Sequence, residues 1–290
     1  MGAITLGYGV ALADIRITRR RASDRRRFPE IRFGVAKLRA VTANAVVGFA
    51  GDLRIGLDLT RRLRLMAEER EHEYGSNVFA LIEPDTFPLL LPELQTAYLR
   101  LYQEENRANG CSLLVVGVSP SQSLLPGTGG PPLAFGHIIR FPRASQGEAS
   151  IEPLLPPARS IGKGRAIAAY REALEQAANP ADMWKFYEDV WHFSRQPNVP
   201  TDFYSALSRH WPSIGAENVA ARVSAAIDEV SEPSVSRNLH YAVVTKERVS
   251  FNGNYTQVPM EDWPIVAFEW EEVLALMDKY EIAPTAALLG

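Results

Sequence analysis

The residue types that most often catalyse reactions or bind metals are scarce in this chain and form no familiar motif. There is no His-Glu-x-x-His zinc motif and no Gly-x-Ser-x-Gly nucleophile motif. The single cysteine, Cys111, excludes an intramolecular disulfide and a cysteine-based zinc site. Gly162-Lys163-Gly164 is too short for a phosphate-binding loop, which needs Gly-x-x-x-x-Gly-Lys followed by Ser or Thr. We therefore expect neither a metal nor a cofactor. The five histidines, which show no ligand-like spacing, are at positions 72, 137, 192, 210 and 240.

Lysine is also rare, so a lysine within a functional pattern is more informative than usual. Of the 31 basic residues only five are lysines, at positions 37, 163, 185, 246 and 279. Six of the arginines fall between Arg19 and Arg27, in the run RRRASDRRR, which has no apolar periodicity. Such a run predicts an exposed loop, and a patch for phosphate or an acidic partner is the alternative interpretation.

Composition limits the class of protein. The chain has 290 residues, 46% of them hydrophobic and 22% charged, which is typical of a globular domain. Its net charge of −3 gives no strong attraction to nucleic acid. No apolar stretch approaches the roughly 20 residues that cross a bilayer, and the first residues resemble neither a signal peptide nor a myristoylation site. We expect a soluble cytoplasmic protein with no membrane or nucleic-acid partner.

Hydrophobic patterning predicts the elements that position any site in the first half of the chain. Residues 3–6 and 10–13 form apolar runs on either side of a Gly7-Tyr8-Gly9 turn, and the second run should continue as a strand through Thr18. Asp52 is a predicted N-cap. The further elements predicted here are strands at 33–38, 45–50, 111–118 and 133–141, a helix that follows Asp52, and a helix over 92–109.

The second half is predicted to be mainly helical, with one clear strand. It comprises helices at 165–178 and 217–230, a strand at 239–245, and a helix at 270–280. The order of strands and helices predicts an α+β fold built as a four-layer αββα sandwich, not a doubly wound parallel sheet. We expect one domain over residues 1–290, with an Arg-rich loop insertion at about 19–30, a helical insertion at about 179–213 and a C-terminal extension at about 250–290.

Five segments together resemble one known family. ALADIRIT (11–18), AKL (36–38) and GFAGD (48–52) resemble the proteasome β-type peptidases, and most closely the bacterial heat-shock-locus V peptidases, which are N-terminal-nucleophile hydrolases. ARSIGKGRAIAAYREALE (158–175) is similar to a strand-to-helix segment of that family, and residues 217–245 are similar to its last long helix and following strand. The resemblance covers roughly half of the chain.

The resemblance implies roles for three residues. In these enzymes a hydroxyl on the first residue is the nucleophile, and the free α-amine of that residue is the base. By motif, Lys37 would lower the hydroxyl pKa, Asp14 would hold Lys37, and the Gly51 N–H would stabilise the oxyanion. The alternative for Asp14 and Lys37 is a partly buried salt bridge that only steadies the sheets. Peptide or protein ligands and a closed homo-oligomeric ring are further implications of the family.

A nucleophile is missing at the position that the family pattern predicts. A two-residue hairpin turn would put Met1 there, and a three-residue turn would put the position ahead of Met1. Thr5 is the only early hydroxyl, but it is expected too deep in its strand. We therefore expect a proteasome-like subunit that is non-catalytic or degenerate and self-assembles. The alternatives are an active threonine-type peptidase or other amide hydrolase after N-terminal processing, and an unrelated αββα domain.

Overall fold

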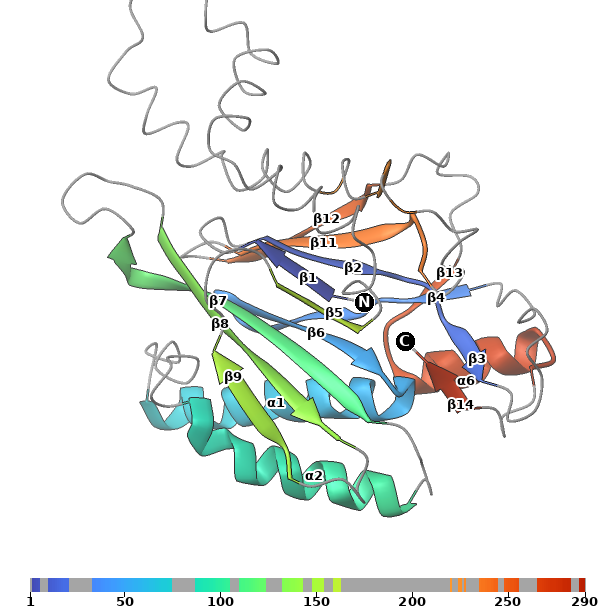
Figure 1. Ribbon diagram of the computed structural model, residues 1–290, viewed down its shortest axis with the longest axis horizontal. Coiled ribbons are helices and arrows are strands. Elements are labelled where there is room, and N and C mark those ends of the chain that lie inside the picture. The colour runs from blue at the N-terminus through green and yellow to red at the C-terminus, as the bar shows by residue number, and fades with distance from the viewer. Residues whose placement is uncertain are drawn as a thin grey trace, which may run out of the picture.

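A computed structural model shows a mixed α+β architecture (Figure 1). The described residues are 2–5, 10–20, 33–74, 87–104, 110–123, 132–142, 148–153, 159–162, 235–244, 248–255, 265–282 and 287–289, together with 220, 224, 225 and 227. Within them lie two five-stranded sheets, two further strand pairs and three α-helices.

Both five-stranded sheets are antiparallel throughout. The first sheet has the order β10 (Arg159–Ile161), β1 (Gly2–Thr5), β2 (Val10–Asp14), β11 (Leu239–Val244) and β12 (Val249–Tyr255). The second sheet has the order β5 (Leu38–Thr42), β6 (Ala45–Gly51), β7 (Cys111–Ser123), β8 (Pro132–Phe141) and β9 (Ser150–Pro153). The opening hairpin and the antiparallel pairing are therefore confirmed, and β6 is an interior strand, as the apolar run at 45–50 indicated.

The two sheets pack against each other through a layer of apolar side chains. Small and branched residues of both sheets form this layer, which explains why β2 carries alanines where it faces β6. In Figure 1 the first sheet lies above the second, with β1 and β2 across from β5 and β6. The buried side chains of this layer are Ala11, Ala13, Leu38, Val46, Ala50, Leu114, Val116, Ile138, Ile161, Ala242 and Val244.

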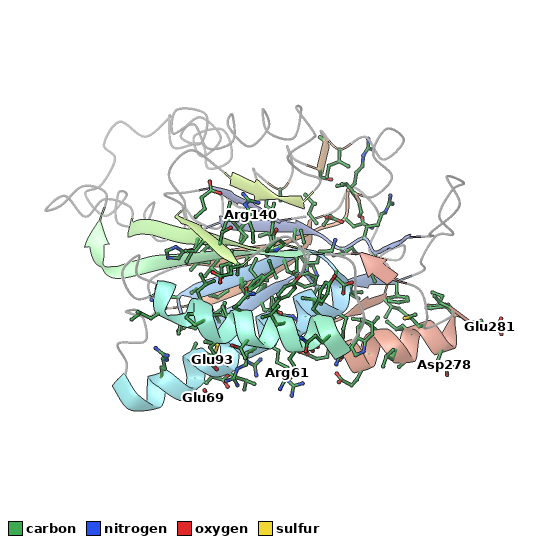
Figure 2. The ribbon with its side chains drawn as sticks, turned by 60° about the horizontal axis from the view of Figure 1, so that its bottom comes forward. Arg61, Glu69, Glu93, Arg140, Asp278 and Glu281 are labelled. Carbon is green, nitrogen blue, oxygen red and sulfur yellow. The ribbon has the colours of Figure 1, made fainter. Side chains whose placement is uncertain are left out.

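Helices cover the other face of the second sheet. Helices α1 (Leu53–Tyr74), α2 (Leu91–Glu104) and α6 (Trp270–Lys279) bury their apolar sides in one cluster with β6 and β7. A 3-10 turn, Phe87–Leu90, leads into α2. Figure 2 shows the charged side chains of Arg61, Glu69 and Glu93 on the side of α1 and α2 away from the sheets. This division of apolar and charged faces is what amphipathic surface helices require.

Asp52 starts α1, as the sequence indicated. Its Oδ1 accepts a hydrogen bond from the Ile55 N–H at 3.2 Å, and the side chain is fully buried. An N-cap carboxylate of this kind satisfies one of the unpaired N–H groups at a helix start. Because Asp52 directly follows Gly51, the cap fixes the direction in which the chain leaves the end of β6.

The N-terminal strands are more broken than the sequence analysis predicted. The second strand does not continue to Thr18 but ends at Asp14, and the predicted strand at 33–38 is split into β4 (Phe33–Val35) and β5 around Lys37. The Arg-rich segment begins as a strand, not a loop: β3 (Thr18–Arg20) pairs with β14 (Ala287–Leu289). Both breaks have a cause in the contacts of Asp14 and Lys37 described below.

The C-terminal segment is built into the fold. Strand β13 (Ile265–Ala267) runs parallel to β4, and the Ala36 N–H donates a 2.9 Å hydrogen bond to the Ala267 carbonyl. Val273 and Met277 of α6 are buried in the same cluster as α1. After β12, which belongs to the first sheet, β13 and α6 therefore pack beside the second sheet.

Several predicted elements lie outside the described residues. These are the helix at 165–178, the helical insertion at 179–213 and the Arg-rich residues 21–30; of the helix at 217–230 only four positions are described. In the part of the chain that the structure does describe, no helix is long and apolar enough to span a membrane.

Candidate functional site

Lys37 and Asp14 meet in the interior of the protein. The Lys37 Nζ lies 3.2 Å from the Asp14 Oδ1, and each side chain is only 1% exposed. The same ammonium donates a 2.8 Å hydrogen bond to the Arg16 carbonyl oxygen. The contact between Asp14 and Lys37 that the motifs predicted is thus confirmed, while the catalytic roles of both residues stay predictions.

The chain leaves both sheets at this contact. The Asp14 Oδ1 also accepts a 3.0 Å hydrogen bond from the Arg16 N–H, which turns the backbone out of β2 directly after Asp14. The Val35 N–H donates a 2.9 Å hydrogen bond to the Ile15 carbonyl oxygen, so β4 lies beside the segment that leaves β2. Lys37 stands between β4 and β5 and reaches inward, which explains the interruption of the predicted strand.

Electrostatics favour the ionised form of Asp14. Burial alone would raise the pKa of this carboxyl group, but the Lys37 ammonium and the N-terminal amino group together outweigh burial, and the pKa lies below its ordinary value of 3.8. Asp14 is therefore a carboxylate at neutral pH. A buried ammonium held in this way can either lower the pKa of a neighbouring hydroxyl or simply tie two layers together.

The beginning of β1 lies beside this pair. Gly2 is opposite Ala13 in the β1–β2 register and opposite Ile161 in the β1–β10 register. The start of β1 therefore reaches the level of Asp14, at the same end of the first sheet.

Thr5 is not part of this cluster. It pairs with Val10, at the far end of the hairpin from Asp14. Four register positions separate Val10 from Asp14, which is about 13 Å at a strand rise of about 3.3 Å per residue. Gly2 lies opposite Ala13, whereas the two turn lengths considered for the hairpin would place it opposite Ile15 or Asp14, so neither turn length is right. None of the described residues of β1 occupies the nucleophile position that the family resemblance predicts.

Gly51 is at the same end of the second sheet as Lys37. In the β5–β6 hairpin Leu38 is opposite Gly48, so Lys37 and Gly51 both lie at the open end. Gly51 has a φ of +118°, and a Cβ there would lie 2.4 Å from the Gly110 carbonyl oxygen. A glycine is thus required by the backbone itself, whether or not its N–H serves as an oxyanion donor.

Cys111 is next to Gly51 in the sheet but is not a nucleophile for this site. Its side chain faces the helix layer and is 3% exposed. Burial, together with the negative charge of Asp52, raises the pKa of the Cys111 thiol far above its ordinary value. The thiol therefore stays protonated at neutral pH.

Sequence reasoning missed one member of the site, the carbonyl group of Arg16. A main-chain oxygen leaves no signature in side-chain spacing, so no sequence signal identifies it. Among the residues that the structure describes, no group of three His, Cys, Asp or Glu side chains could hold a metal ion.

Comparison with models of protein families found no match, and comparison with curated proteins found none either. The resemblance carried by the short motifs therefore stays a prediction. The geometry of Asp14, Lys37 and the start of β1 is the ground on which a function can be proposed.

The first prediction concerns the energetic coupling of Lys37 and Asp14. Lys37→Met and Asp14→Asn should each destabilise the protein by about 3–5 kcal/mol, because each leaves a buried polar partner uncompensated. The double variant should lose clearly less than the sum of the two losses. Urea unfolding at pH 7 measures all four free energies, and Lys279→Met, at an exposed lysine, is the matched control. Simple additivity would contradict the prediction.

The same pair predicts a pH dependence. Because the folded-state pKa of Asp14 is below 3.8, the carboxylate stabilises the fold above about pH 4, and this stability is lost as the pH falls through the folded-state pKa. In Lys37→Met the pKa of Asp14 should rise, so the free energy of unfolding should depend less steeply on pH between about 2 and 4. An unchanged slope would show that Lys37 does not hold this pKa.

A further prediction tests the backbone at Gly51. Gly51→Ala should destabilise the protein by more than the 1–3 kcal/mol typical of a strained positive φ, because its Cβ also meets a main-chain oxygen. Gly48→Ala is the control, since its Cβ meets the movable end of Leu38 at 2.9 Å and lies at an ordinary contact distance, 3.8 Å, from the Lys37 carbonyl oxygen. Denaturant unfolding compares the two variants, and equal losses would be the contrary result.

Proposed function

We propose that this chain is a proteasome-like subunit of the N-terminal-nucleophile fold in which Asp14 and Lys37 are retained for structure, so that it acts by self-assembly and by binding peptide or protein. The observation that supports the proposal best is the buried Lys37–Asp14 contact beside the start of β1. Two facing antiparallel sheets with helices on the second sheet provide the surroundings that this family requires.

A fourth layer of helices on the first sheet is part of the proposal. Ala220, Ser224 and Ile227 are fully buried and follow the i, i+4, i+7 spacing of one helix face. The Ser224 hydroxyl donates to the Arg237 carbonyl oxygen at 3.0 Å, and the Arg237 Nε donates to the Ile227 carbonyl oxygen at 2.8 Å. Since Arg237 closely precedes β11, these contacts support a helix packed against the first sheet.

The position of Thr5 argues against a threonine mechanism that starts at this residue. Strand β1 lies between β10 and β2. Its pairing with β10 consists of three residue pairs, in which Gly2, Ala3 and Ile4 are the residues of β1. Cleavage after Ile4 would remove these three residues and separate β10 from the rest of the sheet. A nucleophile at Thr5 would therefore require loss of the strand that carries it.

An active amide hydrolase with a different N-terminal residue is the second candidate. It is favoured by the place of Lys37, whose ammonium group contacts Asp14 at the end of the first sheet where β1 begins. A positive charge beside the first strand is what an N-terminal hydroxyl nucleophile needs. Proteolytic assays separate the two candidates.

We predict that the chain of this sequence neither cleaves a panel of fluorogenic peptides nor reacts with covalent proteasome-type probes. The panel should be run on the wild type, Thr5→Ala and Lys37→Ala, with circular dichroism to verify folding and intact mass to identify the first residue. Turnover that disappears in Thr5→Ala would restore the threonine peptidase. Turnover that survives in Thr5→Ala and disappears in Lys37→Ala would identify a hydrolase with another nucleophile.

Self-assembly needs an exposed apolar surface, and α1 does not provide one. The apolar residues of α1, such as Leu59 and Leu63, are buried in the core of the chain itself. Exposed apolar side chains occur instead at Leu89, just before α2, and at Leu99, within α2. These two leucines are the proposed contact with a second copy.

We therefore predict a homo-oligomer that depends on Leu89 and Leu99. Light scattering at micromolar concentration should show an oligomer for the wild type and a lower mass for the Leu89→Glu/Leu99→Glu variant. Leu274→Glu, at an exposed leucine of α6, is the matched control and should not change the mass. A monomeric wild type would remove the assembly part of the proposal.

A further inference from the structure

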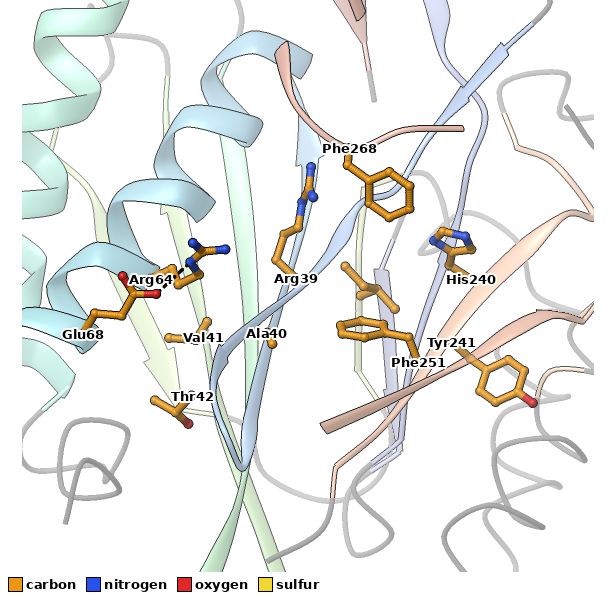
Figure 3. Close-up of a pocket in the computed structure, with 11 residues that line it drawn as sticks. Arg39, Ala40, Val41, Thr42, Arg64, Glu68, His240, Tyr241, Phe251 and Phe268 are labelled. Atoms are coloured by element: carbon orange, nitrogen blue, oxygen red, sulfur yellow. Dashed lines mark ion pairs between the residues drawn. The ribbon is translucent and has the colours of Figure 1, made fainter. Parts of the chain in front are cut away.

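A pocket of about 570 Å³ opens between the edges of the two sheets. One wall is the whole of β5, which is an edge strand of the second sheet, and the opposite wall comes from β11 and β12 of the first sheet. Helix α1 contributes Arg64 and Glu68, and Phe268 closes one end (Figure 3). The volume is that of a typical small-molecule site. Asp14, Lys37 and Gly51 do not line it, so an inference about this pocket does not rest on the proposed function.

The walls of the pocket are largely apolar. Phe251 and Phe268 both face the pocket, and each remains 48% exposed, which is a large exposed fraction for an aromatic side chain. Figure 3 shows Phe251 near Tyr241 on one side and Phe268 near Arg39 and His240 on the other. A ligand that fills the space between the two phenyl rings would remove their apolar surface from water.

Arg39 supplies a cation with one nitrogen that lacks an acceptor among the described residues. Its guanidinium lies 5.5 Å from the centre of the Phe268 ring, and its Nη1 is 3.5 Å from the carboxylate of Glu269, which is itself about half exposed. The Nη2 is buried and has no hydrogen-bond partner among the described residues. A buried guanidinium nitrogen without an acceptor is costly unless a ligand supplies one.

Several charged groups lie around Arg39. Burial and the repulsive charge of Arg64 lower the pKa of Arg39, while the negative charges of Glu269 and Glu272 raise it without offsetting burial. Arg64 is itself paired with Glu68 at 3.0 Å. Because the carboxylates of Glu68, Glu269 and Glu272 lie in or near the pocket, a singly charged anion fits better than a dianion.

We propose that this pocket binds a small apolar carboxylate, with the guanidinium of Arg39 as the carboxylate anchor and with Phe251 and Phe268 as the walls around the apolar body. Arginine offers parallel N–H donors to a carboxylate, and the free Nη2 is one of them. The carboxylate could belong to a free acid or to the terminus of a short peptide with an apolar last residue. Both sources present the same group to Arg39.

The experiment is calorimetric titration of the full chain with three probes of similar shape. These are 1-naphthylacetate, the uncharged 2-(1-naphthyl)ethanol and the dianionic 1-naphthyl phosphate. We expect 1:1 binding of 1-naphthylacetate that is at least tenfold tighter than that of either other probe. Equal binding of the alcohol would overturn the role of Arg39, and tighter binding of the phosphate would overturn the carboxylate assignment.

Variants assign the effect to single residues. Arg39→Met should weaken 1-naphthylacetate at least tenfold and the alcohol less than threefold, because only the acid uses the charge. Arg54→Met is the matched control: Arg54 pairs with Asp58 at 2.9 Å and does not line the pocket. It should change affinity less than twofold, and a loss equal to that of Arg39→Met would overturn the proposal.

Glu269→Gln provides a test that does not remove Arg39. It takes away the carboxylate that competes for the guanidinium, so 1-naphthylacetate should bind several-fold more tightly. Weaker binding would overturn the proposed geometry. Decanoate and N-acetylphenylalanine, each compared with its amide, then separate a free acid from a peptide terminus. If neither acid binds more tightly than its amide, the proposal fails.

Discussion

The ion pair between Lys37 and Asp14 connects the two sheets where neither can supply a hydrogen bond to the other. Asp14 is the last residue of β2 in the first sheet, and Lys37 directly precedes β5 in the second. Facing sheets otherwise touch only through apolar side chains, which fix their separation but not their relative position along the strands. A buried ion pair is directional and is satisfied at only one position, so it can set how the first sheet lies over the second.

The irregular backbone around the pair follows from this connection. The Asp14 carboxylate accepts from the Arg16 N–H, and Lys37 donates to the Arg16 carbonyl, so Arg16 and Ile17 do not continue the pairing of β2. The strands that follow, β3 and β4, therefore diverge from both large sheets. Their partners come from the C-terminal segment, through β14 and β13. The same contact that joins the sheets thus also creates the place where the end of the chain packs.

The parts of this arrangement that could be predicted from sequence are those with local causes. The hairpin of β1 and β2, the buried strand at 45–50 and the cap at Asp52 each depend on neighbouring residues. The pairing of β3 with β14 could not be predicted, because Ala287–Leu289 is three residues long and its partner is far away in the sequence. The contact of Lys37 with Asp14 was expected only from the family resemblance. Arg39 gave no signal, because one arginine in a strand looks like any solvent-facing residue until its surroundings are known.

The pairing of β3 with β14 has a consequence for how this protein folds during synthesis. Arg20 and Ala287 are opposite each other and are separated by 267 residues along the chain. A nascent chain therefore leaves β3 without this partner until residues 287–289 have left the ribosome. An unpaired strand edge can pair with other chains. Completion of the β3–β14 pair is thus a late step of folding.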